Sequence, residues 1–151
     1  SFPDAPERML VSMEADVFPL ANPEDAILID GAIGEKSIFH ETFGYYAHGV
    51  GPETAILPTG WRSRLVAVCN ENTRGTTGWC LDPGDLAVSK LLAGREKDLD
   101  WLQDLLDHRL VSAGIIRQRL EETELEKPGQ RDIALARLER LEKRMPPSFP
   151  C

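Results

Sequence analysis

The sequence predicts an α+β protein, in which a mixed β-sheet with one crossing helix is followed by a helical C-terminal part. The prediction rests on a change in pattern near residue 82. Short apolar runs punctuated by glycine and proline fill residues 1–81, whereas apolar residues three and four apart fill residues 82–145. The 151 residues can bury a sizeable core. We therefore expect an α/β core over 1–81, helices packed on it over 82–145, and a flexible tail over 146–151.

Residues 1–81 contain signals for strands, one helix and one turn. Asn22 is a good helix cap, Pro23 suits the first helical position, and acidic residues follow, so a helix is expected from about Pro23 to Ile33, ending at Gly34. A polar, glycine-containing segment over 71–77 predicts a hairpin-like turn between two strands. The predicted strands cover residues 9–18, 44–50, 65–69 and 78–81.

Four helices are predicted after residue 81. Asp82 caps the first and Pro83 starts it, and the second begins at about Glu96. Ser112 caps the third, and the fourth follows the break at Pro128-Gly129. Their apolar positions recur at helical spacing. These positions are Leu86, Val88, Leu91 and Leu92; Leu99, Leu102, Leu105 and Leu106; Ile115, Ile116 and Leu120; and Ile133, Leu135, Leu138, Leu141 and Met145.

Charge and hydropathy narrow the classes of partner. The chain carries 25 acidic and 17 basic residues, a net charge of −8. Affinity for a nucleic-acid backbone comes from clustered Lys and Arg, so this balance gives no support to a nucleic-acid partner. No apolar run approaches the roughly 18 residues of a membrane span, and the N-terminus does not look like a signal peptide. We expect a cytoplasmic protein that does not enter the membrane.

The three cysteines do not predict a disulfide framework or a zinc site. Cys69, Cys80 and Cys151 contain no C-x-x-C pair, and no histidine lies at metal-ligand spacing from them. Cys69 and Cys80 are expected to be buried thiols in a reducing compartment.

The first candidate site is the pair Glu14 and Asp16. Alternate side chains of a strand point to the same face, so the two carboxylates would lie side by side, as oxygen ligands for Mg²⁺ against a triphosphate must. Two acids on a solvated strand face are the simpler interpretation. The apolar residues on both sides of the pair favour the metal site, because adjacent carboxylates in an apolar setting need a compensating cation.

The second candidate site is the run from Lys90 to Asp100. Lys90 lies near the end of one predicted helix, and Arg95 and Asp98 cross into the next. The cations could bind phosphate oxygens while the acid orients them. A salt-bridged helix turn, which the helix dipoles favour, explains the same residues.

The remaining polar residues carry weaker signals. His40, His48 and His108 have no mutual spacing typical of a metal site or a catalytic triad, so structural histidines are the preferred interpretation. Arg62 and Arg64 would neutralise the acid pair if they faced it.

The segment from Leu81 to Leu106 resembles nucleotidyltransferase-like proteins of the minimal, AbiEii-type toxin kind. The resemblance rests on an acid-Pro-x-Asp-Leu motif, a single lysine and a Gly-Arg-x-Lys-Asp-x-Asp run. Residues 12–17, 39–46 and 49–54 are similar to a bacterial subgroup of that superfamily, and the likeness extends to about Leu120. It implies a nucleotidyltransferase fold, with Mg²⁺ and a nucleoside triphosphate as ligands.

The family pattern can be assigned residue by residue. Glu14 and Asp16 match the metal-binding acid pair, with Glu in place of the usual Asp, and Lys90 matches the lysine that contacts the triphosphate. Asp98 or Asp100 matches the acid beyond it. The Gly-Ser turn and helix expected before the acid pair are not in the sequence, so either the chain starts after them or it keeps the fold without the catalysis.

Two functions follow from the resemblance. In the first, Glu14 and Asp16 bind Mg²⁺ and act in catalysis, and Lys90, Arg95 and Asp98 bind the nucleotide, for transfer of a nucleotidyl group to an unknown acceptor. In the second, the protein is a catalytically inactive interaction module. Its C-terminal helices would then bind a partner protein, as in a toxin–antitoxin pair.

Overall fold

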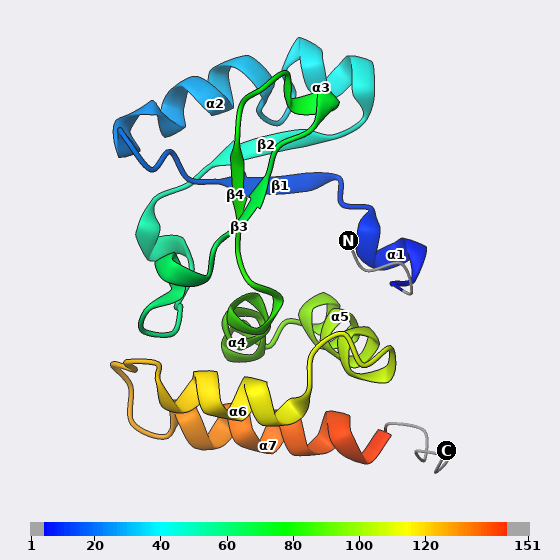
Figure 1. Ribbon diagram of the computed structural model, residues 1–151, viewed down its shortest axis with the longest axis vertical. Coiled ribbons are helices and arrows are strands. Elements are labelled where there is room, and N and C mark those ends of the chain that lie inside the picture. Colours follow the sequence, from blue (N-terminus) through cyan, green and yellow to red (C-terminus); the bar gives the residue numbers. More distant parts are fainter. Residues whose placement is uncertain (1–4, 145–151) are drawn as a thin grey trace. The chain divides into compact units, whose positions relative to one another are not determined.

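The computed structural model describes residues 5–144 (Figure 1). Two compact units make up the chain, an N-terminal unit of Pro6–Ala55 and a C-terminal unit that begins at Ile56. The predicted flexible tail over 146–151 and the apolar position Met145 lie outside the described residues. Within the described part, no helix has both the length and the apolar character needed to cross a bilayer.

The N-terminal unit contains two parallel strands joined by a helical crossover. Strands β1 and β2 pair in parallel, and the chain returns from one to the other through α2 and α3 (Figure 1). Parallel neighbours require such a crossover, because no tight turn can connect them. The elements are α1 (Glu7–Leu10), β1 (Glu14–Val17), η1 (Pro23–Asp25), α2 (Ala26–Ile33), α3 (Ile38–Phe43), β2 (Tyr46–Gly49) and η2 (Pro52–Thr54), where η marks a 3-10 helix.

Helix α2 packs closely against β2. A side chain at Gly49 would place its Cβ 2.0 Å from the carbonyl oxygen of Ala26, so glycine is what permits this approach. A second contact fixes the same end of the strand, since the Gly49 N–H donates to Oδ1 of Asp30 at 2.8 Å. These contacts set the position of β2, and with it the side chains that β2 presents beside β1.

Two predictions for the N-terminal unit have different outcomes. The helix expected over 23–33 is confirmed, with a 3-10 first turn and Gly34 directly after its last residue. The strand expected over 9–18 is wrong in its first part, since Glu7–Leu10 form a helical turn and only Glu14–Val17 pair as a strand. Pro6 is extended there and its carbonyl accepts from the N–H of Met9, so the backbone is satisfied locally.

The C-terminal unit contains an antiparallel hairpin before its long helices. Its strands pair Val66 with Cys80 and Val68 with Gly78, which confirms the predicted turn between two strands. Among the described residues the strands form two separate two-stranded sheets, where one mixed sheet was expected, while the α+β class is confirmed. The elements before the long helices are η3 (Trp61–Arg64), β3 (Val66–Val68), η4 (Glu71–Thr73) and β4 (Gly78–Cys80).

The cysteines of this hairpin correct an expectation. Cys69 and Cys80 are exposed free thiols, although they were predicted to be buried. The reason is the setting of the hairpin, in which every residue of β3 and of β4 is exposed. An apolar run such as 65–69 therefore predicts the strand but not its burial.

All four predicted helices are present, and their caps act as expected. The Asp82 side chain accepts from the N–H groups of Gly84 and Asp85, and Ser112 Oγ accepts from that of Ile115. Helix α4 contacts each of the other three (Figure 1). The helices are α4 (Pro83–Ala93), α5 (Glu96–Asp107), α6 (Ala113–Glu121) and α7 (Gln130–Arg144). Their fully buried apolar residues include Val88, Leu91, Leu102, Leu105, Leu106, Ile116, Leu120 and Leu138.

The boundary between the two compact units lies earlier in the chain than the start of the long helices. Long helices begin at Pro83, as expected, but the division into units falls between Ala55 and Ile56. The segment before the hairpin is tied to the helices, since the Thr59 N–H donates to the Glu122 carbonyl at 3.0 Å. Contacts across the sequence, which a residue pattern does not show, therefore group this segment with the helices.

Candidate functional site

The carboxylates of Glu14 and Asp16 lie on one face of β1. They are two residues apart in an extended strand, so their side chains point to the same side. Both are accessible, with 41 % and 61 % of their side chains exposed. The predicted pair of adjacent carboxylates is therefore present in the geometry that the sequence indicated.

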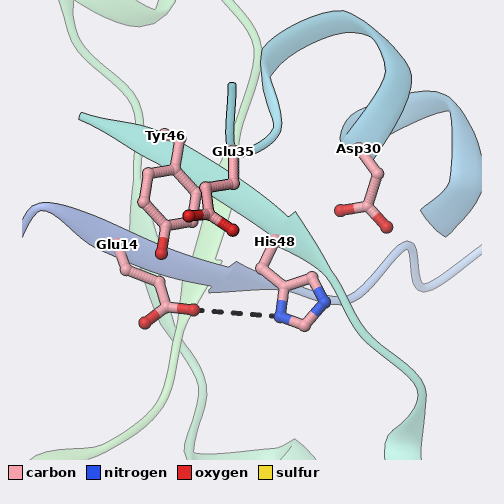
Figure 2. A pocket seen from close by; sticks show the side chains of 5 residues that line it. All are labelled: Glu14, Asp30, Glu35, Tyr46 and His48. Carbon is pink, nitrogen blue, oxygen red and sulfur yellow. Dashed lines mark ion pairs between the residues drawn. The ribbon is translucent and has the colours of Figure 1, made fainter. Parts of the chain in front are cut away.

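Strand β2 adds a histidine to this pair. Asp16 is opposite His48 in the parallel register, and Glu14 is opposite Tyr46. Nδ1 of His48 lies 3.9 Å from Oε1 of Glu14 (Figure 2). It also lies 3.7 Å from Oδ1 of Asp16. One ligand atom from each of the three residues lies within 4.8 Å of the others, so the group could hold a metal ion.

The spacing of the three histidines favours a structural role for His48, so it does not identify this residue as a neighbour of the acids. The useful signal was the predicted strand over 44–50, because a parallel pairing of that strand with the one carrying Glu14 and Asp16 brings His48 beside the acids. The register that puts His48 opposite Asp16 is a property of the pairing between β1 and β2. It is not visible in the spacing of the three histidines.

A pocket lies beside this group. Its described lining is made by Glu14, Asp30, Glu35, Tyr46 and His48 (Figure 2). Three of these residues are acids and none is Lys or Arg, so the pocket favours a cation over an anion. The pKa of Tyr46 is raised, first by loss of hydration and then by the charges of Glu14 and Glu35, which oppose ionisation of the phenol.

His40 has the structural role that the sequence predicted. Its Nδ1 accepts from the backbone N–H of Lys36 at 3.0 Å, and its ring lies 4.7 Å from that of Tyr46. Lys36 has a positive φ of 65°, so this bond supports an unfavourable backbone conformation. In His40, Nδ1 is therefore already hydrogen-bonded. In His48, the same ring atom faces the carboxylates of Glu14 and Asp16.

The second predicted site is a buried carboxylate between two cations. Asp98 has no exposed side-chain surface and accepts from Nζ of Lys90 at 3.0 Å and from Nε of Arg95 at 2.5 Å. Nζ of Lys90 also lies 5.2 Å from the centre of the Trp101 ring. Burial alone would raise the pKa of Asp98, but the hydrogen bonds from Arg95 and Lys90 outweigh it and lower the pKa below its usual value.

The accessibility of these three side chains separates their roles. The Lys90 side chain is 26 % exposed and that of Arg95 is 63 % exposed, so both can still meet an anion in solvent. Asp98 is enclosed and both of its oxygens accept from the cations. Asp98 therefore orients Lys90 and Arg95, as expected of a salt-bridged helix turn.

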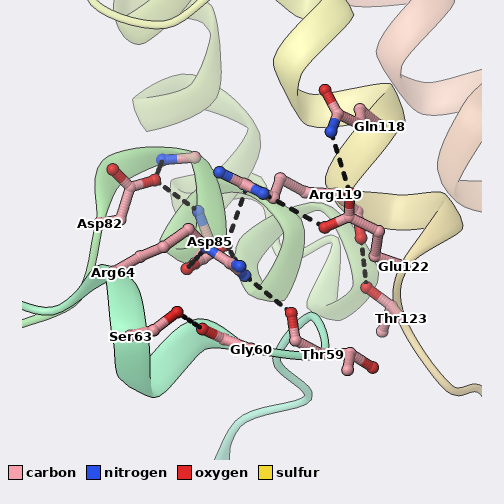
Figure 3. A network of polar contacts seen from close by, with 11 residues as sticks. Thr59, Gly60, Ser63, Arg64, Asp82, Asp85, Gln118, Arg119, Glu122 and Thr123 are labelled. Atoms are coloured by element: carbon pink, nitrogen blue, oxygen red, sulfur yellow. Dashed lines mark hydrogen bonds and ion pairs between the residues drawn. The ribbon is translucent and has the colours of Figure 1, made fainter.

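A third polar cluster is centred on Asp85 in α4, and sequence reasoning did not identify it. Its fully buried carboxylate accepts from Nε of Arg64 at 2.8 Å and from Nη2 at 2.9 Å (Figure 3). Nε of Arg119 lies 3.4 Å from the same carboxylate. The expectation that Arg64 neutralises the acid pair is therefore replaced by a pairing with Asp85, whose hydrogen bond raises the pKa of Arg64.

The candidate residues thus form two groups, one in each compact unit. Glu14 and Asp16 belong to the N-terminal unit, and His48 joins them there. Lys90, Arg95 and Asp98 belong to the C-terminal unit, where Asp98 contacts both cations.

Comparison with known proteins identifies a family for this chain. The sequence model of a family described as a nucleotidyltransferase of unknown function (DUF6036) matches residues 25–144. The matched segment includes Lys90, Arg95, Asp98 and His48, whereas Glu14 and Asp16 precede it. Searches of the curated proteins and of the solved structures return no match. The acid pair is therefore supported by its geometry rather than by the family match.

Proposed function

Since the chain belongs to the nucleotidyltransferases of unknown function, we propose that it transfers a nucleotidyl group from a nucleoside triphosphate to an acceptor with the help of Mg²⁺. The observation that carries this proposal is the placement of Glu14 and Asp16 on one exposed face of β1, beside an acid-lined pocket. Adjacent carboxylate oxygens are the ligands that Mg²⁺ prefers, so the donor set fits this ion.

Each group of residues has a distinct task in this proposal. Glu14 and Asp16 would hold Mg²⁺, which when bound neutralises charge on the triphosphate oxygens. Lys90 and Arg95 would bind phosphate oxygens, and Asp98 holds both cations in place.

The proposed reaction is a displacement at phosphorus. A nucleophilic atom of the acceptor forms a bond to the α-phosphorus of the triphosphate, and the bond from that phosphorus to its bridging oxygen breaks. Pyrophosphate leaves, and the proton of the acceptor passes to solvent. Catalysis of this kind depends on positioning and on stabilisation of charge, which exposed carboxylates and cations can provide.

Ligand-induced stabilisation tests the proposal on the full 151-residue chain. The melting temperature is measured with Mg²⁺, with each of the four ribonucleoside triphosphates, and with both together. A ligand at 100 times its Kd adds about 2.7 kcal/mol, which corresponds to a shift of roughly 5 to 10 °C. No shift with any Mg²⁺–nucleotide combination would overturn the proposal in favour of the inactive interaction module.

Matched variants separate the two groups of residues. We expect Asp16→Asn to remove the Mg²⁺-dependent part of the shift, while Glu24→Gln, an exposed acid elsewhere in the N-terminal unit, keeps it. We expect Lys90→Gln to weaken nucleotide binding by about tenfold, while Lys97→Gln, an exposed lysine of α5, leaves it unchanged. Equal effects of Lys90→Gln and Lys97→Gln would contradict the assigned role of Lys90.

A further inference from the structure

We propose that His48 is a third ligand of the metal, so that the site binds Mn²⁺ in preference to Mg²⁺. The inference rests on the proposed function for the use of Glu14 and Asp16 as metal ligands, and it adds a residue and a metal class. Neither the family match nor the motif that suggested the acid pair points to a histidine.

The geometry supports a shared site across the two strands. Residues paired in register on parallel strands project to the same face, so His48 stands directly beside Asp16. Nδ1 of His48 is 3.7 Å from the Asp16 carboxylate and 3.9 Å from that of Glu14. Neighbouring ligands of an octahedral ion are about 3 Å apart at bond lengths of about 2.1 Å. Small rotations of exposed side chains are enough to close this difference.

The residues around His48 leave its Nδ1 available to a cation. The described residues that line the adjacent pocket include no Lys or Arg that would compete for the carboxylates. The Asp30 carboxylate is already used, because Oδ1 accepts from the Gly49 N–H. His40, by contrast, has Nδ1 engaged by the Lys36 N–H. Glu14, Asp16 and His48 are therefore the groups placed to share one ion.

The ligand chemistry distinguishes Mn²⁺ from Mg²⁺. Mg²⁺ prefers oxygen ligands and retains several waters, whereas an imidazole nitrogen favours first-row transition ions. One imidazole beside two carboxylates therefore favours Mn²⁺ over Mg²⁺, and three protein ligands leave coordination positions for phosphate oxygens. A site of two acids alone would have no such reason to prefer Mn²⁺.

Binding of Mn²⁺ in the absence of nucleotide tests the inference on the full chain. Free Mn²⁺ is followed by its electron paramagnetic resonance signal, and Mg²⁺ is then added as a competitor. We expect His48→Ala to weaken Mn²⁺ binding by at least about tenfold while changing Mg²⁺ affinity less than about threefold. His108→Ala removes an exposed histidine at the end of α5 and serves as the matched control with unchanged binding.

A spectroscopic readout identifies the nitrogen directly. Pulsed electron paramagnetic resonance of the bound Mn²⁺ should show coupling to a ¹⁴N nucleus, which disappears in His48→Ala and remains in His108→Ala. His48→Asp offers an oxygen in the same place, so it should keep metal binding and lose both the coupling and the preference for Mn²⁺. More than half of the His48 side chain is exposed, and circular dichroism checks that the variants fold.

The outcomes distinguish this inference from the proposed function. If Asp16→Asn abolishes Mn²⁺ binding while His48→Ala leaves it unchanged and no ¹⁴N coupling appears, the inference is overturned and the acid pair stands. An ion pair in which His48 only neutralises the acids gives this result. If Mn²⁺ binding depends on His48 but no nucleotide stabilises the chain, the inference holds and the proposed transferase fails. Absence of any Mn²⁺ binding overturns the inference.

Discussion

Asp98 shows how one buried charge organises its neighbours. Its carboxylate is fully enclosed and is held by Lys90 and Arg95, both of which keep access to solvent. A buried carboxylate without cations would be costly, so the cations are required for the fold as well as available to a ligand. Because Asp98 holds both cations, replacing Asp98 tests how much this contact stabilises the turn at Gly94.

Replacement of Asp98 should destabilise the C-terminal unit. We expect Asp98→Asn to lower the free energy of unfolding by about 2 to 3 kcal/mol, because charged hydrogen bonds from Lys90 and Arg95 are lost. Urea unfolding followed by circular dichroism measures the change. Asp100→Asn, at an exposed position of the same helix, should change stability by less than about 0.5 kcal/mol. Similar losses in both variants would show that Asp98 has no special role.

The lowered pKa of Asp98 makes this stabilisation dependent on pH. A depressed pKa in the folded state stabilises the protein fully above the unfolded value of about 3.9 and progressively less as pH falls through the folded value. The stability of the wild-type chain should therefore fall more steeply than that of Asp98→Asn below about pH 4. Urea titrations between pH 2 and 6 would reveal the difference, and parallel curves would contradict it.

At the scale of elements, local signals and long-range contacts have different predictive value. The four C-terminal helices and the helix over 23–33 were predicted from caps, proline positions and apolar spacing, which act within a few residues. The strand over 9–18 was predicted only in part, because an apolar run of that length fits a helical turn and a strand equally. Strand partners could not be predicted in the same way.

The approach of α2 to β2 gives a test at this scale. We expect Gly49→Ala to destabilise the N-terminal unit by at least about 2 kcal/mol, because the new Cβ would collide with the backbone of Ala26. Thermal and urea unfolding measure the loss.

Gly31→Ala is the matched control for this test. Gly31 lies within α2 with nothing within 4 Å of an added Cβ, so alanine should raise stability by up to about 1 kcal/mol. If the two variants were equally stable, the close contact at Gly49 would not constrain the fold. The same pair can be assayed for Mn²⁺ binding, since the position of β2 sets that of His48.

At the scale of the whole molecule, the apolar core is unevenly distributed. Among the described residues, the N-terminal unit buries one apolar side chain, that of Ala47. The other buried apolar side chains belong to the C-terminal unit. Exposed large apolar residues of the N-terminal unit include Met13, Val17, Ile27, Leu28, Ile38 and Phe43. Burial of apolar surface is the main stabilising contribution, so the helices should be the more stable part.

Hydrogen exchange should detect this difference. We expect amides of α4 to α7 to exchange at least about 100-fold more slowly, after correction for sequence, than those of β1, α2 and β2. Mass spectrometry of peptides from the intact chain gives the rates. Equal protection in both parts, or slower exchange in the N-terminal unit, would show that the buried surface does not set local stability.

The α+β class, the helices with their caps and the hairpin could all be predicted from the residue pattern, as could the residue types from which a site can be built. These features depend on neighbours within about four residues or on strand alternation, which a pattern records directly. The fold was needed to show that His48 lies beside Glu14 and Asp16, and that Arg64 pairs with Asp85. Both pairings join segments that are far apart in the sequence. They depend on strand register and helix packing, which a local residue pattern does not record.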